Sequence, residues 1–204
     1  MGDLDTDLIA FYDQESDERS KRPLDVLRAA RQTEFADRLT MEGCSSLLEV
    51  GVGPGRDAVE FIDGGVEVVG LDLSLNHARI ASAAGVPSVQ ASLYSIPFAS
   101  RTFHACWTMS TLLHVPDSRF DEAMQSVCAV LRPGALLAIG LWGGRDAEFV
   151  SEFDQIKPAR FFSLRSHDRI AAMVGGHGSI ELFDTWPHGA NDWEYQFIVV
   201  RTTT

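Results

Sequence analysis

The stretch LLEVGVGPGRDA, residues 47–58, decides the fold. Its apolar start predicts a short buried strand, its three glycines at alternate positions predict a tight turn, and the residues after them predict a helix. A glycine turn alone is a weak signal, but one that joins a strand to a helix is typical of α/β domains that bind nucleotides.

The regions around this stretch continue the alternation of strand and helix. Further strands are expected at residues 66–72, 88–91, 103–109 and 135–142, with a closing pair at 179–186 and 194–201. Helices are expected at residues 24–39, 57–63, 74–85, 120–131 and 166–174, with Pro23 in the first turn of the earliest one. Strands that alternate with helices pair in parallel, and such sheets bind ligands beyond the carboxyl ends of their strands.

Two acidic residues near these strand ends indicate the kind of cofactor. Asp72 ends the second predicted strand, about 20 residues after the glycine turn, where a carboxylate can accept hydrogen bonds from ribose hydroxyls. Glu49 precedes the glycines and would repel a pyrophosphate but not an ammonium group. The turn also has the spacing GxGxG, with Pro54 inside it, and not the GxGxxG of dinucleotide folds. The pattern therefore favours S-adenosylmethionine (SAM) over NAD.

With these features, the chain resembles the class I SAM-dependent methyltransferases. LLEVGVGPGRDA looks like their first motif, VVGLDLS (residues 68–74) like the second, SIPFASRTFHACWTMSTLLHVPD (95–117) like the region of strand 4, and VLRPGALLAIGLW (130–142) like that of strand 5. RFFSLRSHDRIAAMV (160–174) is similar to a late helix of the small-molecule branch. The resemblance implies an α/β, Rossmann-like three-layer sandwich whose mostly parallel seven-stranded sheet has an antiparallel last strand. It also implies a single domain, with an N-terminal helical lid at residues 1–40 and the SAM-binding part at 41–204.

The same resemblance implies which residues bind the cofactor. They are Tyr12 of the lid, Glu49, Gly51, Gly53 and Met109 at the methionine part, Asp72 at the ribose, and Leu73, Ser92 and Leu93 at the adenine. Tyr12 has the alternative interpretation of an aromatic anchor for the terminus. The sequence departs from the family at Ser92, where the family often has an acid, and at Phe103-His104, where it usually has Phe-Asp. A hydroxyl accepts hydrogen bonds more weakly than a carboxylate does.

His114 is the candidate catalytic residue. It follows the fourth predicted strand on the ligand side, and a histidine can act as a general base near neutral pH. An equally weighted alternative is a structural histidine in the loop before Pro116. Methyl transfer mainly requires the acceptor and the methyl carbon to be held close and aligned, and a carboxylate acceptor needs no base.

A late group of residues is the candidate substrate pocket. The group follows the fifth predicted strand and consists of Trp142, Arg160, Phe161, His188 and Trp193. Arg160 would suit a substrate carboxylate, although each of these residues alone is more often a core or surface residue.

The composition excludes several classes of partner and site. The 204 residues carry a net charge of −12, which opposes binding to nucleic acid. The three cysteines form no CxxC pair, so neither a disulfide framework nor a metal site is expected. We expect the cysteines to be reduced and the protein to be cytoplasmic. No signal peptide and no apolar run long enough for a membrane are seen.

The sequence therefore predicts an enzyme that methylates a small molecule or a peptide, with O-methylation preferred. N-methylation and a catalytically silent SAM-binding module are the alternatives. An NAD-dependent oxidoreductase is disfavoured, because neither its glycine spacing nor a Tyr-Lys proton relay is found.

Overall fold

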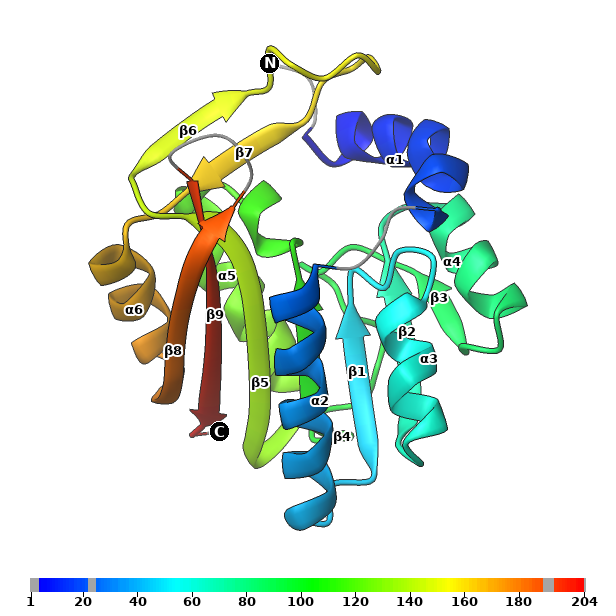
Figure 1. Cartoon of the computed structure of the whole chain (residues 1–204), viewed down its shortest axis with the longest axis vertical. Helices are drawn as coiled ribbons and strands as arrows, with labels where there is room; N and C mark the ends of the chain where they lie inside the picture. The colour runs from blue at the N-terminus through cyan, green and yellow to red at the C-terminus, as the bar shows by residue number, and fades with distance from the viewer. Residues whose placement is uncertain (1–3, 22–24, 189–192, 204) are drawn as a thin grey trace.

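The protein is described by a computed structural model, which covers residues 4–21, 25–188 and 193–203. Its centre is a seven-stranded sheet (Figure 1) with the order β3-β2-β1-β4-β5-β9-β8. The strands are β1 (Ser46–Val50), β2 (Glu67–Asp72), β3 (Ser88–Gln90), β4 (Phe103–Met109), β5 (Leu131–Gly143), β8 (Gly178–His188) and β9 (Trp193–Thr202). Strands β1 to β5 pair in parallel, whereas β9 is antiparallel to both β5 and β8. The predicted fold class is confirmed.

Both faces of the sheet are covered, which is why its strands are continuous apolar runs. Along β1, Leu47 faces the core beneath one layer of helices, while Leu48 and Val50 face the core beneath the other. The first layer contains α2 (Val26–Met41), α3 (Arg56–Asp63) and α4 (Leu75–Ala83), and the second contains α5 (Asp117–Ala129) and α6 (His167–Gly175).

The helix signals in the sequence correspond to real caps and packing faces. Ser74 precedes α4 and accepts a hydrogen bond from the backbone of His77 at 3.1 Å, so the predicted cap is confirmed. The predicted apolar stripe is buried along α5 from Phe120 to Cys128, but the helix ends at Ala129, and Leu131, predicted as its last residue, begins β5. Helix α2 begins at Val26 with Asp25 as its cap, and Pro23, predicted for its first turn, lies outside the described residues.

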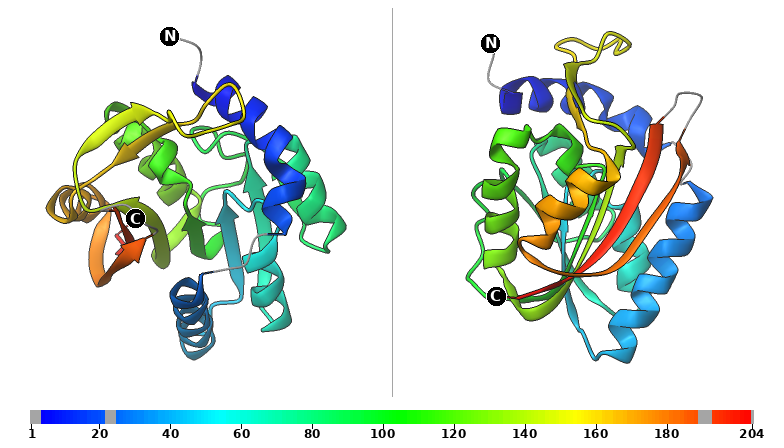
Figure 2. Two further views of the ribbon diagram at one scale, coloured as in Figure 1. Left: turned by 45° about the horizontal axis from the view of Figure 1, so that its top comes forward. Right: turned by 90° about the vertical axis from the view of Figure 1, so that its left-hand side faces the viewer.

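Helix α1 (Leu4–Ser20), which falls within the expected N-terminal helical lid, lies over the carboxyl ends of the strands. A two-stranded sheet of β6 (Ala147–Val150) and β7 (Phe161–Leu164), which the sequence did not predict, lies beside it. Figure 2 shows the segment between β6 and β7 extending towards α1, and Gln14 of α1 donates to the backbone carbonyl of Lys157 in this segment at 3.2 Å. Together, α1 and the β6–β7 sheet cover the end of the sheet where a ligand would bind.

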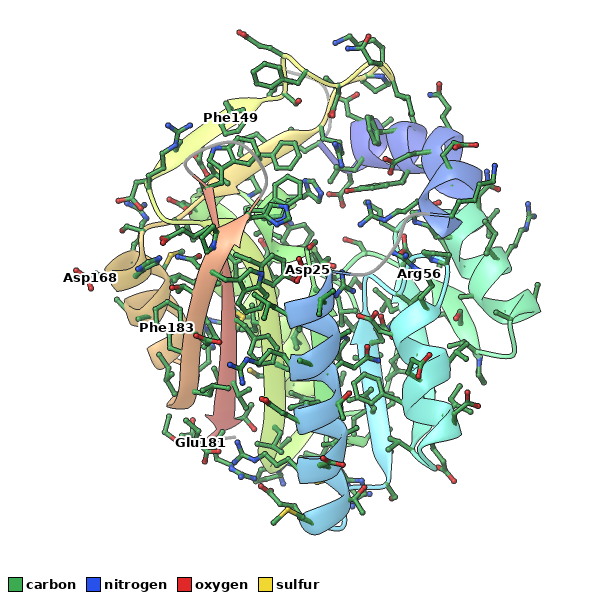
Figure 3. All side chains as sticks on the ribbon, viewed as in Figure 1. Asp25, Arg56, Phe149, Asp168, Glu181 and Phe183 are labelled. Atoms are coloured by element: carbon green, nitrogen blue, oxygen red, sulfur yellow. The ribbon has the colours of Figure 1, made fainter. Side chains whose placement is uncertain are left out.

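The side chains distinguish the two ends of the molecule. In Figure 3, Asp25 and Arg56 mark the ends of α2 and α3 that lie towards the strand tips, Phe149 lies above them on β6, and Glu181 lies at the opposite end of the sheet. None of the helices in the described part of the chain combines the length and the hydropathy that a bilayer crossing requires.

Candidate active site

The glycine turn connects β1 to α3 and leaves backbone open to a ligand. Gly51 and Gly53 have φ angles of 75° and 54°, which side-chain-bearing residues rarely adopt. A Cβ at position 51 would lie 1.9 Å from Oγ1 of Thr111, whereas a Cβ at position 53 would meet no atom within 4 Å. The turn is therefore tight on one side and open on the other.

Asp72 lies beside this turn because β1 and β2 are neighbours in the sheet. One carboxylate oxygen accepts a hydrogen bond from the backbone N–H of Gly53 at 2.8 Å, and the other accepts one from the backbone N–H of Ser74 at 2.8 Å. The residue is only 7% exposed. Two backbone donors thus fix the carboxylate in place, and its remaining lone pairs are available to ligand hydroxyls.

A cavity lies above these residues, at the carboxyl ends of the strands. Every residue predicted for the cofactor except Glu49 lines it, and so does His114. The structure thus brings together Tyr12, Gly51, Gly53, Asp72, Leu73, Ser92, Leu93, Met109 and His114.

Glu49 lies beneath the turn and not on the cavity wall. It is 3% exposed, and its Oε2 has no hydrogen-bond partner among the described residues. Burial and the negative charges of Asp57 and Asp72 raise the pKa of Glu49 well above its usual value, and only Arg28 opposes them. A buried carboxylate with an unused acceptor suits a cationic group arriving through the turn.

A buried polar network holds the turn from below. Arg28 of α2 forms an ion pair with Asp57 of α3, and the indole N–H of Trp107 donates to the same carboxylate oxygen at 2.8 Å. Gln32 also donates to the backbone carbonyl of Asp57 at 2.8 Å. No sequence pattern marks this network, because its members lie 25, 29 and 50 positions away from Asp57.

His114 is held in one tautomer at the end of η1 (Leu112–His114). Its Nδ1 lies 2.7 Å from the carbonyl oxygen of Phe161, which can only accept, so Nδ1 carries the proton and the neutral ring presents Nε2 as an acceptor. The hydroxyl of Tyr12 lies 2.6 Å from that Nε2. Burial lowers the pKa of His114 to about 3, with a smaller contribution from the charge of Arg160. The ring is therefore a weak base.

Helix α1 contacts the core along its length. Asp13 accepts hydrogen bonds from the hydroxyl of Ser74 and, at 3.3 Å, from the backbone N–H of Asn76. Asn76 returns a bond from its side chain to the carbonyl of Asp13 at 3.0 Å. Since Ser74 caps α4 directly after β2, these contacts attach α1 beside Asp72.

The residues predicted for the substrate do not line the cavity. Trp142 stacks on Phe162, His188 and Trp193, with ring centroids 5.5, 4.8 and 5.6 Å away. Arg160 is already paired, because its Nε and Nη2 donate to Asp154 at 2.9 and 2.7 Å. Phe161 contributes its backbone carbonyl to His114.

Sequence reasoning missed two charged residues of the cavity wall, Asp5 and Arg19 of α1. The resemblance implied a helical lid at residues 1–40, but no motif in it marks these two residues. Among the residues that the structure describes, no group of three or more His, Cys, Asp or Glu side chains is placed to hold a metal ion.

The fold and the site together define a Rossmann-like domain that binds an adenosine cofactor at its strand ends. Residues 47–134 match the family model of a methyltransferase domain. The chain is 31% identical to O-methyltransferase resE of Aspergillus sclerotiorum over 132 residues, 60% of this chain and 49% of that protein. It is 35% identical to the malonyl-[acyl-carrier protein] O-methyltransferase of Enterobacter lignolyticus (strain SCF1) over 128 residues, 61% of this chain and 47% of that protein.

The structure is also similar to that of the Burkholderia thailandensis 1,6-didemethyltoxoflavin-N1-methyltransferase bound to its substrate and S-adenosylhomocysteine. The TM-score is 0.74 at 18% identity, over 97% of this chain and 88% of that one. Residues 47–134 are thus similar to methyltransferase domains, and the fold of the chain is similar to that of a methyltransferase that binds S-adenosylhomocysteine, the demethylated form of S-adenosylmethionine. The chain spans about half the length of the curated relatives it matches.

Proposed function

We propose that the protein transfers a methyl group from SAM to an oxygen atom of a small molecule or peptide, and that this oxygen is already ionised at neutral pH. The observation that carries the proposal is that the glycine turn, Asp72 and α1 line one cavity beside a histidine of very low basicity. When bound, SAM supplies an electrophilic methyl carbon on a sulfonium that is its own leaving group.

The residues of the cavity fit the parts of that cofactor. Asp72 would accept hydrogen bonds from the ribose hydroxyls, and the backbone at Gly51 and Gly53 would lie against the methionine part. Glu49 would accept a hydrogen bond from the ammonium group and thereby satisfy its orphaned oxygen. The carboxylate of Asp72 on the cavity wall favours a ligand of net positive charge.

The preference for an ionised oxygen follows from the state of His114. A protonated amine or an ordinary hydroxyl must lose a proton to its surroundings when it is methylated, and a general base with a pKa near 7 would assist. His114, with its pKa of about 3, gives little such help. A carboxylate or an acidic hydroxyl needs none.

Two further observations support an anionic acceptor. Arg19 lines the cavity; its guanidinium, which pairs with Glu15 at 3.6 Å, would attract an anion. The fungal and enterobacterial relatives are both named O-methyltransferases. The net charge of −12 favours a small acceptor over a nucleic acid, and a cytoplasmic location stays a prediction.

The test has two stages. Calorimetry with SAM, S-adenosylhomocysteine and NAD should show binding of the first two only. The protein is then incubated with SAM and with carboxylic acids, phenols and amines of similar size. Mass spectrometry records which of these acceptors gains one methyl group. Methylation of amines alone would contradict the oxygen preference, and cofactor binding with no product from any acceptor would favour a silent binding module.

A further inference from the structure

A carboxylate of α1 reaches the part of the cavity that lies beside β3. Asp5 lines the cavity, and one of its oxygens accepts a hydrogen bond from the hydroxyl of Ser92 at 3.2 Å. The oxygen of Ser92 accepts in turn from the backbone N–H of Tyr94 at 3.4 Å. The hydroxyl of Ser92 therefore donates to Asp5, and the Asp5 carboxylate is a hydrogen-bond acceptor at the part of the cavity beside β3.

This part of the cavity is where the base of a bound nucleoside would lie. Strand β3 is the neighbour of β2, with Asp72 opposite Gln90, and the backbone N–H of Ala91 donates to the carbonyl of Asp72 at 2.9 Å. The loop at residues 91–94 therefore starts directly beside the carboxylate that would hold the ribose. Apolar side chains line the cavity around it, namely Leu8, Leu73, Ala91 and Leu93.

An apolar slot with a carboxylate at its edge is suited to one feature of adenine. The base has flat apolar faces, and its exocyclic amino group is a hydrogen-bond donor. A carboxylate is an acceptor only, with about four lone-pair sites on its two oxygens, so it can accept from more than one donor at a time.

We propose that Asp5 binds the exocyclic amino group of the adenine and is the residue that selects adenine in this protein. This inference rests on the proposed SAM site. It assigns to Asp5 a specific contact with the cofactor, and to Ser92 the task of positioning the Asp5 carboxylate.

The position of Asp5 has a consequence for how the cofactor is recognised. Asp72 belongs to the sheet, but Asp5 belongs to α1, which is held on the core through Tyr12 and Asp13. Recognition of the base therefore requires α1 to be in place over the cavity. The same helix, α1, would thus both contact the adenine amino group and cover the cavity.

The experiment compares two ligands that differ in one group. Calorimetry measures the affinity of the full-length protein for S-adenosylhomocysteine and for its analogue in which hydrogen replaces the adenine amino group. Wild type should bind the parent ligand ~10- to 100-fold more tightly, because a hydrogen bond to a charged group has this strength. Asp5→Ala should bind both ligands within about threefold of each other. Asp7→Ala is the matched control, since Asp7 lies two positions away on α1 but does not line the cavity.

Ser92→Ala separates the two residues. If Asp5 makes the contact, this variant should keep most of the discrimination between the two ligands. Discrimination that survives in Asp5→Ala but disappears in Ser92→Ala would overturn the inference, as would equal binding of both ligands by wild type. Absence of any binding of S-adenosylhomocysteine by wild type would instead remove the proposed function itself, so the two failures are distinguishable.

Discussion

The hydroxyl of Tyr12 lies 2.6 Å from Nε2 of His114, which joins α1 to the end of β4 across 102 positions of sequence. Because the other ring nitrogen donates to the carbonyl of Phe161, His114 connects α1 on one side to β7 on the other. The two elements that cover the cavity are thus attached to the same imidazole. The candidate catalytic residue, His114, is therefore also the residue that holds the two covering elements together.

Replacing Tyr12 by phenylalanine should loosen this closure. The variant removes one hydroxyl and leaves a buried acceptor on His114 without its donor, which costs about 1 to 3 kcal/mol. We expect the affinity for S-adenosylhomocysteine to fall ~5- to 50-fold in calorimetry. Tyr94→Phe is the matched control, because the Tyr94 ring lines the same cavity but is held by Arg119, whose guanidinium lies 3.5 Å from its centroid. Equal losses in both variants would contradict the closure.

The pKa of His114 predicts how stability depends on pH. Burial lowers this pKa from 6.5 to about 3 in the folded protein, so between these values the unfolded chain binds the extra proton. The contribution of His114 to stability is then present above pH 6.5 and is lost as the pH falls towards 3, by up to about 1.4 kcal/mol per unit.

Urea unfolding of wild type and His114→Gln between pH 7.5 and 4.5 measures this effect. Glutamine does not titrate, so the difference in unfolding free energy between the two proteins should shrink steadily below pH 6.5. A difference that stays constant over the whole range would show that His114 titrates normally. The same low pKa predicts that the rate of methyl transfer shows no break near pH 6.5.

Glu49 predicts that cofactor binding releases a proton. Its pKa is raised by burial and by Asp57 and Asp72, and an ammonium group placed beside it would lower that pKa again. The affinity for S-adenosylhomocysteine should therefore rise as the pH rises towards the raised pKa of Glu49. Calorimetry in buffers of different ionisation enthalpy counts the released protons, and Glu49→Gln should abolish the release and weaken binding ~10-fold or more. An unchanged proton count in Glu49→Gln would assign the release to another group.

The sequence predicted those parts of the structure that depend on residues close together along the chain. The apolar residues and glycines from Leu47 to Gly55 are sufficient to predict a strand and a turn. Ser74 accepts a hydrogen bond from the backbone of His77, three residues later, and so caps α4. The alternation then places Asp72 beside the turn, because parallel neighbours end at the same edge of the sheet. Most of the cofactor side of the cavity follows from these local rules.

The cover of the site could not be found in this way. Helix α1 has no single apolar stripe, since Leu8 and Phe11 are buried while Tyr12 and Asp13 hydrogen-bond to distant core residues. The sequence suggested that Arg160 binds a substrate carboxylate. In the fold, however, its guanidinium is paired with the carboxylate of Asp154, six positions away. Contacts of this kind depend on tertiary structure and leave no periodic signal.

The ion pair of Arg28 and Asp57 supports the turn from α2, and its burial gives it an effect on stability that a surface pair lacks. The side chain of Asp57 is 2% exposed and that of Arg28 is 18% exposed. Removing the cation by Arg28→Met leaves a buried carboxylate that only Trp107 still contacts, which should cost about 3 to 5 kcal/mol of unfolding free energy. Arg31→Met is the matched control on the same helix. Arg31 is 29% exposed and pairs with the more exposed Glu34 and Asp184, so its loss should cost less than about 1 kcal/mol.

Denaturant unfolding of the two variants and wild type, with and without S-adenosylhomocysteine, separates the pair's effect on the fold from its effect on the site. Because Asp57 follows the glycine turn in the first turn of α3, its displacement should also disturb the backbone at Gly53. Arg28→Met should therefore lose affinity for the ligand even at temperatures where it remains folded, whereas Arg31→Met should bind as wild type does. If Arg28→Met were destabilised but bound the ligand normally, the network would support the core without positioning the turn.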